Sequence, residues 1–118
     1  MGFITHIPGT NPLPPHDPHP LRRGVGVLGL HEGRTLLLAL ATRTRFACPV
    51  AGCDLSEEKR AACHAELPSL FLTADYREML AHPGVDIVAI YTPDPLHAQH
   101  IEMAFEAGKD VICTKPLV

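Results

Sequence analysis

Short apolar runs alternate with helix-length segments along most of this chain. Apolar residues at successive positions, without polar alternation, are typical of strands buried on both faces of a parallel sheet. Strands joined through helices form right-handed βαβ units. The pattern therefore predicts an α/β fold, a Rossmann-like doubly wound parallel sheet of about five strands with helices on both faces. The predicted strands are Gly24–Leu30, Phe46–Asp54, Ser69–Thr73, Val85–Thr92 and Asp110–Thr114.

The segments between these strands carry helix signals. Ser56 followed by Glu57 and Glu58 predicts a helix start, because a hydroxyl caps free N–H groups and carboxylates offset the positive end of the helix dipole. Asp75 and Glu78 have the spacing of a capping box. The predicted helices are Arg34–Ala41, a helix from Ser56 to about Leu67, a short one after Asp75, and Leu96–Ala107.

Proline and glycine mark where these elements are interrupted. Pro49 lies inside the second strand and predicts an irregular start, because proline cannot donate a ladder hydrogen bond. His82-Pro83-Gly84 ends the short helix, and Gly108 stands just past the last one, where glycine is favoured.

Residues 1–20 differ from the rest of the chain. They hold six of the 12 prolines, together with His6, His16 and His19. Such a segment has little to bury and cannot form a regular ladder, so we expect a flexible arm at 1–20 and a domain at 21–118. The His16/His19 pair leaves metal binding open as an alternative to a solvated tail.

Composition excludes several classes of function. With 118 residues, 46% hydrophobic and 19% charged, the chain is ordinary for one small soluble domain. A net charge of −3 gives no reason to expect nucleic acid, and no apolar run approaches the roughly 20 residues of a membrane span. The four cysteines form no Cys-x-x-Cys pair, so neither a zinc site nor a disulfide framework is indicated. Free thiols favour the cytoplasm.

The first predicted strand ends in glycines. Gly24 to Gly29 match G-x-G-x-x-G literally, yet they lie within the strand, whereas phosphate binding requires glycines after it. The register for a dinucleotide therefore begins at Gly29. His31 then replaces the second glycine and Arg34 the third, and Gly33 offers permissive backbone at a shifted position. An ordinary tight strand–helix turn remains the alternative.

Asp54 strengthens the dinucleotide interpretation. It ends the second strand, 25 residues after Gly29, near the spacing of an acid that accepts from the adenosine ribose hydroxyls. A carboxylate there would repel a 2′-phosphate, which favours NAD. Arg34 and Arg60 could serve such a phosphate, so NADP is not excluded. The alternative role is an Asp that caps the next turn or helix.

The last third of the chain is the most specific. Thr92-Pro93, His97 four residues after that proline, Ala107-Gly108-Lys109 and Lys115-Pro116 stand in order. Together they resemble the N-terminal domain of the Gfo/Idh/MocA family, which includes glucose–fructose oxidoreductase and inositol dehydrogenase. The resemblance runs from about Leu21 to Val118.

The resemblance implies an NAD(P)-dependent oxidoreductase acting on a sugar, a cyclitol or a related hydroxyl compound. By position, the loop from Gly29 would hold the pyrophosphate and Asp54 the ribose. Thr92, Pro93 and His97 would run beside the cofactor. Lys115 with Pro116 would stand at the nicotinamide, where an ammonium stabilises the alkoxide character that develops before hydride leaves.

Some positions depart from the family pattern. Thr114 stands where the family usually has Glu before the Lys-Pro pair, and Asp94 where it often has Asn. The family's C-terminal domain, with its proton-relay residues and most of the substrate pocket, has no counterpart here. We therefore expect the isolated chain to bind dinucleotide without turnover. A non-catalytic nucleotide-binding, regulatory or interaction module is the alternative, and a gene fragment is a further one.

The last predicted strand, Asp110–Thr114, would also have no neighbour on its outer side. An apolar strand at an open sheet edge is a template for pairing with another chain. We expect self-association of the isolated chain through this strand.

Overall fold

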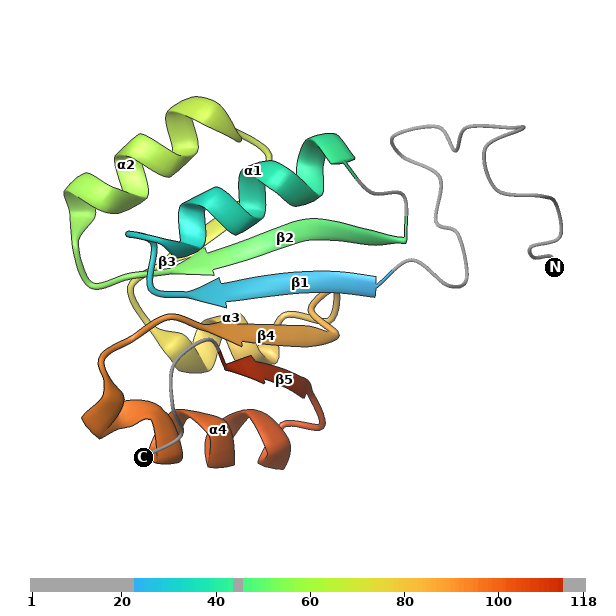
Figure 1. Ribbon diagram of the computed structural model, residues 1–118, viewed down its shortest axis with the longest axis vertical. Coiled ribbons are helices and arrows are strands. Elements are labelled where there is room, and N and C mark those ends of the chain that lie inside the picture. The colour runs from blue at the N-terminus through green and yellow to red at the C-terminus, as the bar shows by residue number, and fades with distance from the viewer. Residues whose placement is uncertain (1–22, 44–45, 114–118) are drawn as a thin grey trace, which may run out of the picture.

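The computed structural model describes residues 23–43 and 46–113. The predicted arm at 1–20, and Thr114, Lys115 and Pro116, lie outside the described residues. The described part contains one five-stranded sheet in the order β3-β2-β1-β4-β5, and every neighbouring pair is parallel (Figure 1). The strands are β1 (Arg23–Leu28), β2 (Ala47–Cys53), β3 (Phe71–Thr73), β4 (Ile87–Ile90) and β5 (Asp110–Cys113). The predicted doubly wound sheet is confirmed.

Helices pack on both faces of this sheet, and each face has its own core. Alternate residues of β1 separate the two cores: Val25 and Val27 face one, and Leu28 faces the other. On the first face Leu37 and Cys63 of α1 and α2 join the core, and on the second Met79 and Ala104 of α3 and α4 do so. The helices are α1 (Gly33–Arg43), α2 (Glu57–Glu66), α3 (Tyr76–Ala81) and α4 (His97–Glu106), and the 3₁₀ turn η1 (Asp94–Leu96) precedes α4.

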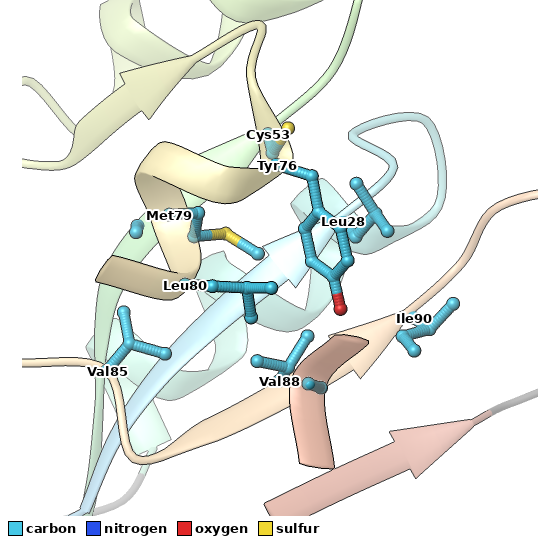
Figure 2. Packing of buried hydrophobic residues seen from close by; sticks show 10 residues of the cluster. Leu28, Cys53, Tyr76, Met79, Leu80, Val85, Val88 and Ile90 are labelled. Atoms are coloured by element: carbon cyan, nitrogen blue, oxygen red, sulfur yellow. The ribbon is translucent and has the colours of Figure 1, made fainter. Parts of the chain in front are cut away.

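The second core is built around α3 and β4. Figure 2 shows Met79 and Leu80 of α3 reaching toward Val85 and Val88, all members of one buried cluster. Within the described part of the chain, no helix is long and apolar enough to cross a membrane.

Three predicted strands were too long by two residues at one or both ends, and one of them, Ser69–Thr73, begins only at Phe71. The first was predicted to reach Leu30, but β1 ends at Leu28, because Gly29 has a φ of +98°, which no strand residue adopts. The run Val85–Thr92 contributes only Ile87–Ile90 to the ladder. Leu30 and Val85 are each 1% exposed. Their apolar character therefore reflects burial in the loops beside the sheet and not membership of a strand.

The irregularity predicted at Pro49 is confirmed. Val25 of β1 pairs with Pro49, but the next residue, Gly26, pairs with Ala51. Val50 is thus an extra residue in β2, a bulge in the ladder at the point where proline removes a donor.

Helix ends mostly follow their sequence signals. The Ser56 hydroxyl accepts from the Lys59 N–H at 3.2 Å and caps α2, and Gly108 has the positive φ (+79°) expected after α4. The reciprocal capping box of α3 was wrong. Asp75 caps α3 by accepting from the Arg77 N–H, but the Thr73 hydroxyl accepts the Asp75 N–H and donates to Glu78. Thr73 therefore takes the place that Glu78 was predicted to occupy.

Candidate functional site

The carboxyl ends of four strands, β2, β1, β4 and β5, lie side by side in the sheet. Leu28 lies between Cys53 and Ile90, and Ile90 pairs with Cys113 in turn. After β1 the chain enters α1 on one face, and after β4 it enters α4 on the opposite face. The ends of β1 and β4 are therefore the switch point of the sheet, the place of the crevice in which α/β sheets bind ligands.

Gly29 lies at this switch point, between the end of β2 and the loop after β4. Its N–H donates to the Cys53 carbonyl of β2 at 2.8 Å, and on the other side the backbone of Tyr91 crosses close to it. A Cβ at Gly29 would lie 3.0 Å from the Tyr91 carbonyl carbon and 3.3 Å from the Thr92 nitrogen. Its φ of +98° is also a conformation that side-chain-bearing residues rarely adopt. Glycine is required here on both counts.

Gly33 is the second glycine that the loop requires, for a different reason. It is the first residue of α1, and a Cβ there would lie 2.3 Å from Cγ1 of Val27 and 3.2 Å from Cδ2 of Tyr91. Gly33 therefore permits close packing of α1 on β1, the role that the sequence register gave to position 34. This choice depends on a contact between loop and strand that spacing alone does not reveal.

The start of α1 faces the crevice from the side of β1. The first N–H groups of a helix have no partner within it, and they carry partial positive charge. His31 and Glu32, just before α1, are both exposed. Arg34 is half-buried and forms an ion pair with Glu66 of α2, so its guanidinium is held by the neighbouring helix.

Asp54 links the end of β2 to the glycine loop. Its Oδ2 accepts the Leu30 N–H at 2.8 Å, and its Oδ1 accepts the Ser56 N–H at 2.8 Å. Each carboxylate oxygen has two lone pairs, so both oxygens can still accept from a ligand. The half-buried carboxylate thus fixes the loop and keeps a negative charge at the crevice. Leu55, 87% exposed beside it, is an apolar neighbour that sequence reasoning did not single out.

Thr92 lies in the loop after β4 and is held at two points. Its hydroxyl lies 3.0 Å from Nδ1 of His100, and its carbonyl is hydrogen-bonded to Nε2 of His97. Pro93, which follows, is exposed. His97 is 0% exposed, and its Nδ1 lies 3.4 Å from Sγ of Cys113. The buried His97 ring therefore contacts Thr92 and Cys113, in the loop after β4 and at the end of β5.

Burial shifts several titrating groups near this edge. Burial and the nearby charge of Asp54 raise the pKa of the Cys53 thiol to about 11. Burial and the neighbouring His97 lower the pKa of His100. The thiol and the imidazole are therefore stabilised in their neutral forms. Among residues 23–43 and 46–113, no group of three His, Cys, Asp or Glu side chains is arranged to hold a metal ion.

These groups suit a particular ligand. A helix N-terminus with glycine-permitted backbone favours a phosphate group, and a fixed carboxylate at the next strand end favours a sugar diol. The two lie on either side of one loop, since Asp54 accepts from Leu30 within it. A dinucleotide carries both groups in that order, so the described residues fit it.

Comparison with known proteins supports the interpretation of this site as a dinucleotide site. Residues 23–118 match the family model GFO_IDH_MocA, described as an oxidoreductase family with an NAD-binding Rossmann fold. The inositol 2-dehydrogenase of Rhodococcus jostii is 33% identical over 95 residues, covering 80% of this chain and 25% of that protein. A 1-carboxy-3-chloro-3,4-dihydroxycyclohexa-1,5-diene dehydrogenase of Comamonas testosteroni is 32% identical over 93 residues, covering 79% and 23%.

A solved structure gives the same picture. The scyllo-inositol dehydrogenase of Lactobacillus casei, crystallised with NAD(H) and scyllo-inositol, superposes with a TM-score of 0.75 at 29% identity. The match covers 81% of this chain and 28% of that one. The chain thus spans about a quarter of the length of the relatives it matches.

Proposed function

Since this chain belongs to the Gfo/Idh/MocA oxidoreductase family and contains its NAD-binding Rossmann domain, we propose that it is the cofactor-binding domain of a dehydrogenase. The substrate of this dehydrogenase would be a sugar, a cyclitol or a related hydroxyl compound. The observation that carries the proposal is the Asp54 carboxylate, which joins the end of β2 to the glycine loop at the switch point of the sheet.

The cofactor-binding residues follow from this arrangement. We place the pyrophosphate at the start of α1, over Gly29, His31 and Gly33, with Arg34 at its side. Asp54 accepts from the adenosine ribose hydroxyls through the lone pairs that its own backbone contacts leave open. A carboxylate in that position repels a 2′-phosphate, which favours NAD over NADP.

The other half of the cofactor would run along the loop after β4. Thr92 and Pro93 border this part of the crevice, and His97 and His100 fix Thr92 from beneath. NAD, when bound, accepts a hydride from the substrate carbon. Lys115, with Pro116, would stand at that end, where its ammonium stabilises negative charge on the substrate oxygen. In the sequence both residues come after Cys113, the last residue of β5, and Thr114.

Fluorescence titration with NADH and NADPH tests the cofactor assignment. We expect saturable NADH binding and weaker NADPH binding. The affinity for NADH should be about ten-fold lower in Asp54→Asn, because the amide offers one uncharged acceptor oxygen to the two backbone N–H groups and the ribose, where the carboxylate offered two charged ones. Lys115→Ala should weaken NADH binding less.

Asp110→Asn is the matched control. Asp110 pairs with Arg23 at the amino-terminal edge of the sheet, so this variant should bind NADH as the unaltered chain does. Failure of the unaltered chain and of Lys115→Ala to bind either nucleotide would refute the cofactor assignment.

We also propose that two copies of this chain associate through β5. This strand pairs with β4 and forms one edge of the described sheet, and Ile112 of β5 and Phe105 of α4 are 49% and 61% exposed. A charge on an edge strand opposes pairing. Light scattering at high micromolar concentration should therefore detect dimers that Ile112→Lys abolishes, and a monomeric unaltered chain would contradict the proposal.

The remaining expectations concern organisation and location. We propose that residues 1–20 form a flexible arm before the domain, which limited proteolysis would test by early cleavage there. The four cysteines are free thiols, which supports a cytoplasmic location.

A further inference from the structure

The His97 side chain connects the ends of two neighbouring strands. Its Nε2 is hydrogen-bonded to the carbonyl of Thr92, in the loop after β4. Its Nδ1 lies 3.4 Å from Sγ of Cys113, the last residue of β5. The ring is 0% exposed, so no water competes for either nitrogen. One imidazole thus ties together the two segments that border the crevice on the side of β4 and β5.

The chemistry of the partners determines the tautomer of this ring. A carbonyl oxygen only accepts, so the proton lies on Nε2 and is donated to Thr92. In the neutral imidazole Nδ1 is then an acceptor, and the Cys113 S–H donates to it. The Cys113 thiol thus donates to the His97 imidazole, and the imidazole donates to the Thr92 carbonyl. A side chain at 97 must accept and donate at once for this arrangement to persist.

Thr92 is held from a second direction as well. Its hydroxyl lies 3.0 Å from Nδ1 of His100, and the His100 carbonyl in turn accepts from the Tyr76 hydroxyl at 2.9 Å. The β4 loop is therefore anchored on α4 and α3. Cys113 joins this anchored loop through His97, and the proposed substrate-side lysine, Lys115, follows Cys113 by two residues.

We propose that the Cys113–His97 pair is a positioning device, which fixes the end of β5 relative to the Thr92-Pro93 loop. The inference rests on the proposed function, because it assigns the pair a role in binding the nicotinamide half of the cofactor. Neither residue contacts the cofactor in this account. Each acts through a neighbour, Cys113 through His97 and His97 through Thr92.

A comparison of two ligands separates this role from general stability. ADP carries the adenosine and pyrophosphate groups that Asp54 and the Gly29 loop would bind, whereas NADH adds the nicotinamide half. Cys113→Ala should weaken NADH binding about three- to ten-fold, the range expected for one lost hydrogen bond, and should change ADP binding by less than two-fold. Cys113→Ser, which keeps an O–H donor, should recover most of the NADH affinity.

Cys48→Ala provides the control for removing a thiol. Cys48 is also a half-buried free cysteine, but it pairs with Gly24 in the amino-terminal half of the sheet, away from the crevice. We expect this variant to bind both ligands normally. His97→Gln, which can donate to Thr92 but offers Cys113 a poorer acceptor, should resemble Cys113→Ala.

Imidazole ¹⁵N NMR on the full chain measures the protonation of the two His97 ring nitrogens and so tests both hydrogen bonds directly. We expect His97 as the Nε2–H tautomer, with a Nδ1 resonance that shifts in Cys113→Ala and returns toward its original position in Cys113→Ser. Unchanged NADH affinity in Cys113→Ala, or an equal loss for NADH and ADP, would overturn the positioning role while the proposed function stands. If the unaltered chain binds neither ligand, the proposed function itself fails and the positioning role fails with it.

Discussion

At the scale of single residues, Asp54 and Gly29 show how a binding loop is held before any ligand arrives. The Asp54 carboxylate accepts from Leu30, and the Gly29 N–H donates to Cys53, so the loop is joined twice to the end of β2. The sequence identified both residues from their types and spacing. It did not predict the contact between Asp54 and Leu30, because that contact joins residues 24 positions apart.

Gly29 and Gly108 separate two contributions to the free energy of unfolding. One is the cost of a positive φ for a residue with a side chain, and the other is the cost of a Cβ that contacts its neighbours too closely. Gly29 and Gly108 both have positive φ, +98° and +79°, but a Cβ has close neighbours only at Gly29. Gly108→Ala should lower the free energy of unfolding by about 1–2 kcal/mol and leave NADH affinity unchanged. Gly29→Ala should cost more and also weaken NADH binding. Urea denaturation and NADH titration measure the two effects, and equal costs would contradict the account.

Stability should fall on both sides of neutral pH. Burial raises the pKa of Cys53 from 9.0 to about 11. Between pH 9 and pH 11 the thiol is therefore deprotonated in the unfolded chain and still protonated in the folded one. The free energy of unfolding decreases as the pH rises through this range. The pKa of His100 is lowered by burial and by His97, so below about 6.5 the unfolded chain binds the extra proton and stability decreases as pH falls.

Urea denaturation from pH 5 to pH 10.5 measures both limbs. We expect a decline of about 1 kcal/mol per pH unit above pH 9. Cys53→Ala should reduce the slope of this alkaline limb and leave the acid limb unchanged. An alkaline limb of the same slope in that variant would show that other buried acids, such as Tyr76, dominate it.

At the scale of elements, α3 depends on its neighbours. A helix of six residues is too short to be stable alone, so packing must hold it. Tyr76, Met79 and Leu80 bury its inner side in the second core. The sequence predicted this helix from its capping residues, whereas its dependence on Thr73 and on α4 required the folded arrangement.

Tyr76→Phe tests the link between α3 and α4. The Tyr76 hydroxyl donates to the His100 carbonyl at 2.9 Å, and the two rings meet edge to face with centroids 5.1 Å apart. Loss of this hydroxyl should lower the free energy of unfolding by about 1 kcal/mol, while the ring packing is retained. Chemical denaturation measures the change. A variant as stable as the unaltered chain would mean that the link contributes nothing.

At the scale of the whole molecule, the parallel sheet with helices on both faces was predictable and the loop contacts were not. Apolar runs separated by helix-length segments predict parallel strands with right-handed connections, and the structure confirms the parallel pairing. The strand order β3-β2-β1-β4-β5 was not predicted and comes from the structure. Strand ends were harder to predict, because Leu30 and Val85 are buried outside the ladder. The role of Gly33 also depended on packing between α1 and β1.

The most direct test of the central claim is a ¹H–¹⁵N NMR titration of the full chain with NADH. Binding at the switch point predicts that the amide signals of Gly29 to Gly33, Asp54 and Thr92 shift together and saturate with one affinity. Signals at the opposite edge of the sheet, such as Asp110, should remain unchanged. No shift at millimolar NADH, or shifts confined to residues away from this crevice, would contradict the account.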